Sequence, residues 1–165
     1  MKAVVLTLLM VGVVGAACGR EDVQAQDLPS TVDIALSDFT NLPDFGWAIS
    51  AAPASVSAGR VAFQITNINT ASDQEGLPDI PHDFVVIKSD LAPGSLPTHG
   101  PGSSVDIFKV DVVAASRALR SGEQATVHLS LDAGDYVLIC SVKPFGVEAS
   151  HYKQGMFLAF TVRDD

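Results

Sequence analysis

The stretch GDYVLICSVKPFGVEASHYKQGMFLAFTV, residues 134–162, decides how the rest of the chain is interpreted. Apolar and aromatic residues fill both ends of it, and each end is typical of a β-strand. Between the two predicted strands stand Cys140, His151 and Met156. A thiolate, an imidazole and a thioether on one inter-strand loop indicate a metal centre that favours soft ligands.

These three side chains are three of the four ligands of a type 1 copper site, which needs a second imidazole. His82 in the run PHDFVVI, residues 81–87, is the candidate for that fourth ligand. It starts an apolar run that predicts a strand buried on both faces. If this strand packs beside the strand that ends at Cys140, His82 reaches the same end of the fold.

The remaining chain predicts short strands separated by turn signals and little helix. Strands are expected over residues 31–39, 45–50, 59–67, 82–88, 124–131, 136–140 and 156–162. This pattern predicts an all-β protein with a Greek-key antiparallel β-sandwich. Trp47 is expected to be a core residue and not a redox relay. Residues 105–119 are ambiguous: VDIFKVDVV could form a short strand, whereas VVAASRAL has helical composition, and an irregular segment with one or two helical turns is expected.

The N-terminal residues predict an exported protein. Residues 1–17 have a short positive start, an apolar run and small residues before a cleavage point, as in a signal peptide. Cys18 follows directly, so lipidation of this residue and membrane attachment are predicted, with ordinary cleavage as the alternative. Residues 18–30 predict a flexible linker, and residues 31–165 a single domain. Cys18 and Cys140 are the two cysteines, and no disulfide between them is expected.

The composition restricts the classes of partner. The formal net charge is −9, which argues against nucleic-acid binding. The same negative charge is compatible with electrostatic steering toward a basic partner protein. The alternative is that it only keeps the protein in solution. Four histidines are too few for a multicopper oxidase, and no second cysteine near Cys140 could form a dinuclear thiolate-bridged centre.

The two motifs together resemble the cupredoxins, the blue copper protein family. The closing Gly-x-Tyr, Cys, His, Gly-Met and Val pattern of residues 134–162 is similar to that family, as is VAFQITN (61–67) followed by PHDFVVI. The resemblance covers about residues 31–162. It implies one type 1 copper ion held by His82, Cys140, His151 and Met156. His99 and His128 are not expected to bind the metal.

Two positions depart from the family pattern. Ten residues separate Cys140 from His151, which is longer than in the small members. Asp83 stands where the family often has asparagine, and we expect it, or else Asn67, to tie the two ligand loops by hydrogen bonds. The resemblance also implies that His151 reaches the surface as the electron port, with Phe145 and Met156 keeping the site partly dry.

The expected function is therefore non-enzymatic electron transport. The chain is predicted to be a periplasmic or membrane-attached monomer that exchanges single electrons with redox proteins of the cytochrome or oxidase class. Two alternatives stay open at this point: a copper chaperone or delivery module, and a metal-free sandwich that binds a partner.

Overall fold

The computed structural model describes residues 28–38, 47–69 and 79–164. The predicted signal peptide, Cys18, most of the predicted linker and the start of the predicted strand over residues 45–50 lie outside these ranges. None of the helices in the described ranges is long and apolar enough to cross a membrane.

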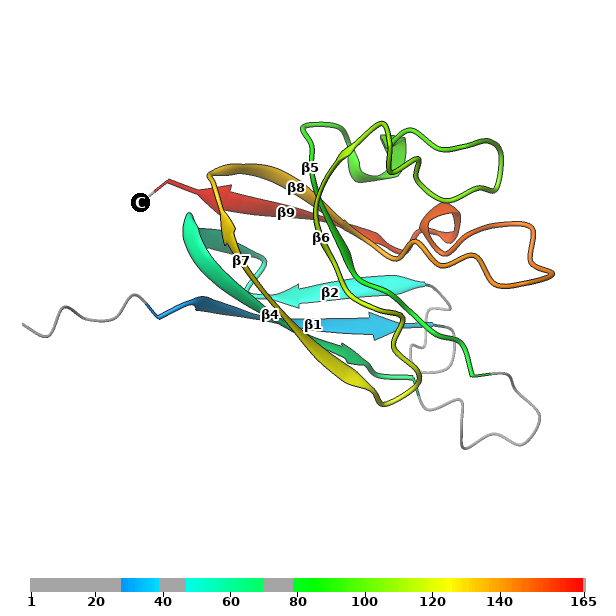
Figure 1. The fold of residues 1–165 in the computed structure, drawn as a ribbon, viewed down its shortest axis with the longest axis horizontal. Coiled ribbons are helices and arrows are strands. Elements are labelled where there is room, and N and C mark those ends of the chain that lie inside the picture. The colour runs from blue at the N-terminus through cyan, green and yellow to red at the C-terminus, as the bar shows by residue number, and fades with distance from the viewer. Residues whose placement is uncertain (1–27, 39–46, 70–78, 165) are drawn as a thin grey trace, which may run out of the picture.

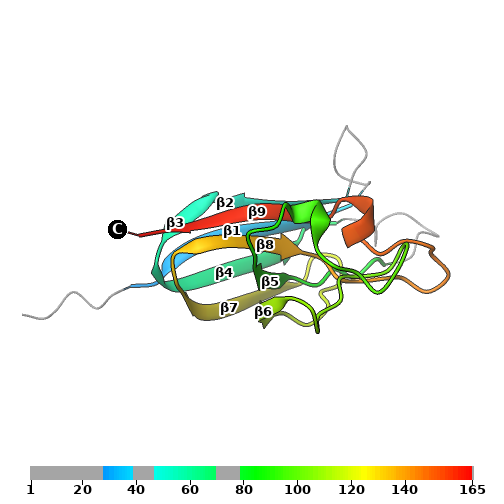
Figure 2. The same cartoon turned by 90° about the horizontal axis from the view of Figure 1, so that it is seen from above.

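Within the described residues, nine β-strands form two sheets that face each other (Figures 1 and 2). The strands are β1 (Ser30–Ser37), β2 (Ala48–Ala52), β3 (Ser55–Ser57), β4 (Gly59–Asn67), β5 (Val85–Lys88), β6 (Asp111–Ala115), β7 (Gln124–Leu131), β8 (Gly134–Ile139) and β9 (Phe157–Arg163). One-turn 3-10 helices in the described part of the chain lie at Pro93–Ser95 and Tyr152–Gln154.

The strand order confirms the predicted Greek-key sandwich. One sheet has the order β2-β1-β4-β7 and the other β3-β9-β8-β5-β6, so the chain crosses between sheets after β2, β3, β4, β6 and β7. The sequence predicted antiparallel sheets, whereas both observed sheets are mixed. β4 runs parallel to β1, and β3 runs parallel to β9. The reason is that β2 reverses the chain after β1 and a second reversal through β3 restores the direction of β1.

The main core lies between the sheets and follows the period of two that strands impose. Val32, Ile34 and Leu36 of β1 point into it, as do Phe63 and Ile65 of β4. Alternate positions such as Asp33 and Gln64 are exposed. The alternation read from the sequence is thus confirmed for the central strands.

β5 is buried on both faces, as its unbroken apolar run predicts. Phe84 and Val86 enter the main core, whereas Val85 and Ile87 belong to a second cluster on the outer face of their sheet. The Pro/Gly-rich segment before β6 covers this outer face with Leu96 and Val105, and Tyr152 joins them. These core contacts hold that long segment against the sheet. It follows that this segment belongs to the packed fold and is more than a surface connection.

The predicted helical turns in residues 105–119 are wrong. Residues Asp111–Ala115 form β6, an edge strand that pairs with β5. Pairing with an available sheet edge outweighs the helical composition of VVAASRAL, and the β-branched Val112 and Val113 suit an edge strand.

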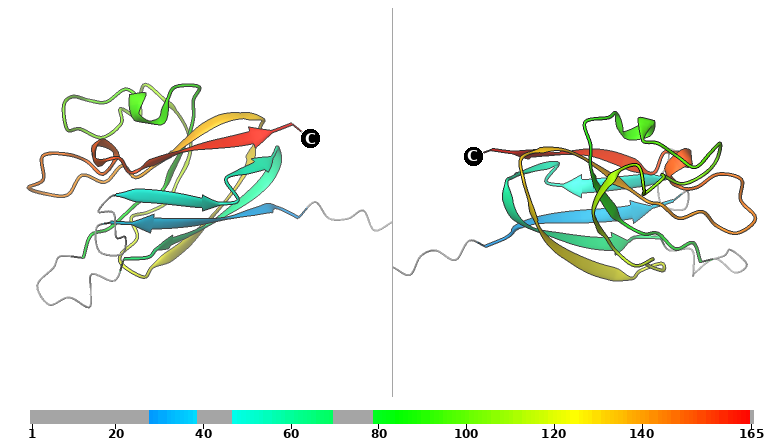
Figure 3. Two further views of the ribbon diagram at one scale, coloured as in Figure 1. Left: turned by 180° about the vertical axis from the view of Figure 1, so that it is seen from behind. Right: turned by 45° about the horizontal axis from the view of Figure 1, so that its top comes forward.

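The segment between β8 and β9 and the segment between β5 and β6 extend past the same end of the sandwich, away from the C-terminus (Figures 1 and 3). The first of these carries the predicted ligand loop, so the candidate centre lies at this end.

Candidate metal centre

Three strand ends bring the predicted ligands together. Cys140 directly follows β8, and Met156 directly precedes β9. His151 opens the 3-10 turn Tyr152–Gln154. His82 precedes β5, which is the neighbour of β8 in the sheet. The adjacency that the sequence interpretation required is therefore present.

The donor atoms of three of these residues form a small triangle. His82 Nδ1 lies 3.1 Å from His151 Nδ1 and 3.7 Å from Cys140 Sγ, and the Sγ lies 3.3 Å from His151 Nδ1. All three side chains are fully buried. A circle through these three atoms has a radius of about 2.0 Å, close to the ~2.0–2.3 Å of metal–nitrogen and metal–sulfur bonds. The three donors thus fit a single metal ion.

Met156 is tied to the other two loop residues by its backbone. Its N–H donates to His151 O (2.9 Å), and its carbonyl accepts from Cys140 N (3.1 Å). Gly155, with a φ of 100°, ends the 3-10 turn in the left-handed conformation and reverses the chain before Met156. The Met156 side chain is fully buried in the main core, which also contains Cys140.

His82 is held by backbone and side-chain contacts on the far side of its ring. It forms an isolated antiparallel bridge with Leu119, with hydrogen bonds of 3.0 and 2.7 Å. Asn69 Nδ2 lies 2.8 Å from His82 Nε2. With Nε2 occupied by Asn69, Nδ1 is the ring nitrogen that faces Cys140 and His151. The contact orients the ring from the side opposite the other two donors.

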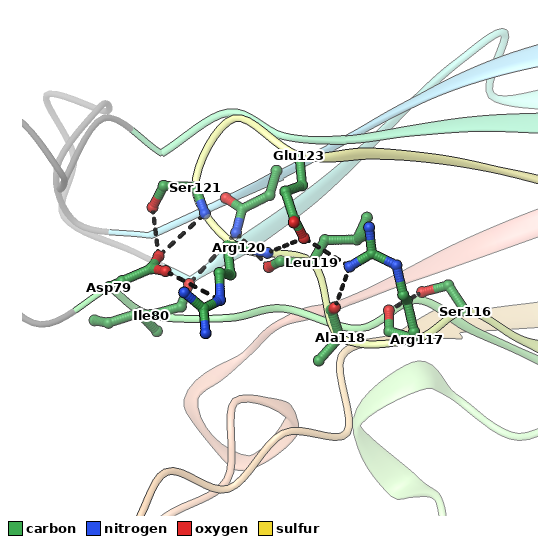
Figure 4. A network of polar contacts seen from close by, with 10 residues as sticks. Asp79, Ile80, Ser116, Arg117, Ala118, Leu119, Arg120, Ser121 and Glu123 are labelled. Atoms are coloured by element: carbon green, nitrogen blue, oxygen red, sulfur yellow. Dashed lines mark hydrogen bonds and ion pairs between the residues drawn. The ribbon is translucent and has the colours of Figure 1, made fainter.

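A polar network on the surface supports the Leu119 segment (Figure 4). Asp79 accepts hydrogen bonds from the N–H and hydroxyl of Ser121, and Glu123 accepts from Arg117 and from the backbone N–H of Arg120. The network connects the chain just before His82 to the chain just after β6. It therefore fixes the bridge from which His82 projects.

Asp83 ties the two ligand loops, as expected from its position after His82. Its carboxylate accepts hydrogen bonds from the Ser141 N–H (2.6 Å) and from the Ser141 hydroxyl. Asn67 has a related role. Its amide donates to Leu119 O (2.9 Å) and its Oδ1 accepts from Asn69 N, so it supports the opposite side of His82.

The loop of residues 141–150 is braced by the Pro/Gly-rich segment. Ser150 N donates to Gly102 O, and the Ser104 hydroxyl donates to Ser141 O. Gly102 has a φ of 70°, and a Cβ there would lie 2.4 Å from Glu148 O. Only glycine permits this close approach. The longer loop is thus packed at both ends.

Burial sets the protonation of the three donors. It lowers the pKa of His82 to about 4, against the opposing charge of Asp79. It lowers the pKa of His151 to about 3, and the neighbouring His82 adds to this effect. Burial also raises the pKa of the Cys140 thiol far above its usual range, and the charge of Asp83 raises it further. At neutral pH both imidazoles are therefore neutral and the thiol is protonated.

Two expectations about the surface of the site are wrong. His151 is fully buried and does not reach solvent, and the Trp47 ring stacks on it with centroids 4.0 Å apart. Phe145 is fully exposed and does not shield the donors. Trp47 packs against the main core, as predicted.

The two other histidines lie apart from the cluster. His99 is exposed and pairs with Asp106, and His128 is on the exposed face of β7. Sequence reasoning missed Asn69 and the contact of Trp47 with His151. The spacing Asn67-x-Asn69 was the available signal for Asn69, because alternation in an extended chain places both residues on one side.

Similar folds are known from solved structures. Auracyanin from the photosynthetic bacterium Roseiflexus castenholzii aligns over 81% of this chain and 97% of its own, with 17% identity and a TM-score of 0.50. A histidine-to-methionine variant of rusticyanin aligns over 82% of this chain and 80% of its own, with 17% identity and a TM-score of 0.50. No protein-family model and no curated protein matches the chain. These likenesses confirm the resemblance noted in the sequence: the chain has the cupredoxin fold.

Proposed function

We propose that this protein is a type 1 copper protein that carries single electrons between redox partners. The observation that carries this proposal is the buried triangle of His82 Nδ1, His151 Nδ1 and Cys140 Sγ, with sides of 3.1–3.7 Å. Two imidazoles and one thiolate in a near-trigonal arrangement are the in-plane ligands of such a site. Met156, the loop methionine, would be the weak axial ligand.

Each residue would have a distinct role. Bound copper would supply the one-electron couple Cu(II)/Cu(I). The Cys140 thiolate favours the softer Cu(I), while the His82 and His151 imidazoles bind both oxidation states. Asn69, Asp83 and the Leu119 bridge hold these ligands from outside. A site fixed in this way has little to rearrange when an electron arrives or leaves.

Burial supports the carrier over a copper-delivery module. Delivery requires that an acceptor replaces the ligands one by one, and Cys140, His82 and His151 are all fully buried. The proposal places the protein outside the cytoplasmic membrane, lipid-attached through Cys18, where it would exchange electrons with a cytochrome or an oxidase. This placement rests on the predicted signal peptide.

The test is an optical and electron spin resonance spectrum of the purified protein after addition of Cu(II). We expect an intense visible thiolate-to-copper charge-transfer band, which is lost in Cys140→Ser. His128→Gln, which removes an exposed histidine away from the cluster, is the matched control and keeps the band. A colourless Cu(II) complex of the wild-type protein would contradict a type 1 site. Fast, reversible voltammetry would favour the electron carrier. Rapid transfer of copper to an acceptor protein would favour the delivery module.

A further inference from the structure

Trp47 covers the candidate centre on the side of His151. The two rings are stacked, with a centroid separation of 4.0 Å and an interplanar angle of 24°. The indole also meets the His82 ring edge-on at 5.7 Å. His151 Nε2 is buried without a hydrogen-bond partner among the described residues. The Trp47 ring is one of the groups that pack against this imidazole.

The four predicted ligands have no direct route to a partner. His82, Cys140, His151 and Met156 are each fully buried. An electron must therefore pass through an intervening group to reach the surface. Tunnelling through protein weakens steeply with distance, so the best group contacts a ligand and is itself accessible.

Trp47 meets both conditions. It is half-buried, and it lines a hollow of about 350 Å³ together with Ile80, Pro81, Phe145 and Val147. Its ring thus connects His151 to the surface through one side chain. A π-stacked indole also offers extended orbitals directly against the imidazole.

We propose that Trp47 is the residue through which the centre exchanges electrons with its partners. This inference rests on the proposed function. It replaces the expectation that His151 itself is the port and the expectation that Trp47 is not a redox relay. In self-exchange between two copies, the reduced copy gives one electron to the oxidised copy. One bound Cu(I) is oxidised and one bound Cu(II) is reduced, with no proton transfer required.

The test compares electron self-exchange rates, measured by NMR on mixtures of the oxidised and reduced protein. Trp47→Leu should lower the rate constant by at least roughly tenfold, whereas Trp47→Phe, which keeps an aromatic ring over His151, should stay within roughly threefold of wild type. Phe108→Leu, which removes an exposed aromatic ring with no contact to the ligands, is the control. The charge-transfer band should persist in all three variants.

An unchanged or faster rate in Trp47→Leu, with the band intact, would overturn the inference and leave the type 1 proposal standing. Absence of the band in the wild-type protein would instead refute the proposed function. If Trp47→Leu does not fold, Trp47→Met serves as the non-aromatic variant with the same expected loss of rate, and fluorescence tests the contact between Trp47 and the centre. Trp47 is the single tryptophan, so binding of Cu(II), and of redox-inert Zn(II), should change its emission. Emission unaffected by either ion, with the band intact, would also overturn the inference.

Discussion

The Nδ1 atoms of His82 and His151 lie 3.1 Å apart, although the residues are 69 positions apart in the chain. Both rings are fully buried, and each approaches the other with the nitrogen that also faces Cys140. Two buried imidazoles this close cannot both carry charge at low cost. Both rings therefore stay neutral over most of the pH range, and their two lone pairs can bind one metal ion.

The first prediction concerns the stability of the metal-free protein. The folded pKa values, about 4 for His82 and about 3 for His151, lie below the unfolded value near 6.5. Between pH 6.5 and 4 the unfolded chain therefore binds more protons, and stability falls as the pH falls. The slope approaches at most about 2.7 kcal/mol per pH unit from two protons. Urea unfolding of the metal-free protein at several pH values measures it.

The double variant His82→Gln/His151→Gln is the control for this slope. Its stability should vary less over the same pH interval, because neither ring remains to take up a proton. An equal slope in this variant and in wild type would assign the effect to other groups.

The second prediction is that metal binding releases one proton. The Cys140 thiol is protonated at neutral pH because burial raises its pKa, whereas both imidazoles are already neutral. Zn(II), a redox-inert probe, should therefore displace about one proton, and its Kd should fall about tenfold per pH unit between pH 6 and 8. Calorimetry in two buffers of different ionisation enthalpy counts the proton. Cys140→Ser should bind more weakly and release none.

The third prediction concerns the charge of Asp83. Its carboxylate accepts two hydrogen bonds from Ser141, next to Cys140. An anion here favours the more positive Cu(II) state, so Asp83→Asn should raise the reduction potential, by an amount on the order of 50 mV. Asn retains an acceptor for the Ser141 N–H, and the visible band should persist. Voltammetry measures the shift, and a lower potential in Asp83→Asn would contradict this assignment.

The fourth prediction tests how the ligand loop is anchored. The Tyr152 hydroxyl donates to Pro93 O (2.8 Å) and accepts from Leu96 N (2.9 Å), directly after His151. Tyr152→Phe keeps the ring and leaves buried Leu96 N without its partner, at a cost of roughly 1–3 kcal/mol. Thermal unfolding measures the loss. Tyr136→Phe, at another tyrosine with a single hydrogen bond to Asp132 O, is the comparison and should cost less.

Local patterns were sufficient to predict the strands and the identity of the donor cluster. β4 and β7 have the predicted boundaries because alternation, Gly59 and the turn before Gln124 all agree. His82 and Cys140 could be paired because each stands at the end of an apolar run. The clustering of their donor atoms follows from the pairing of β5 with β8.

Non-local packing decided what the sequence interpretation missed. β6 depends on an open edge of β5, and this edge decides between the strand and the helical turns that the local pattern of residues 105–119 left open. The contact of His151 with Trp47 is also non-local. Trp47 is more than 100 positions away and directly precedes β2, a strand of the other sheet. The family pattern predicted an exposed histidine because it describes the ligand loop and not the residue that stacks on it.

The fifth prediction identifies the role of Met156. This side chain is fully buried, and its backbone bonds to both Cys140 and His151. Met156→Leu conserves volume, so the fold should lose less than about 1.5 kcal/mol. The thioether is a weak donor to Cu(II), so its loss should raise the reduction potential while the Cys140-dependent band remains. A potential equal to that of wild type, in a variant with normal stability and colour, would show that Met156 acts only as a core residue.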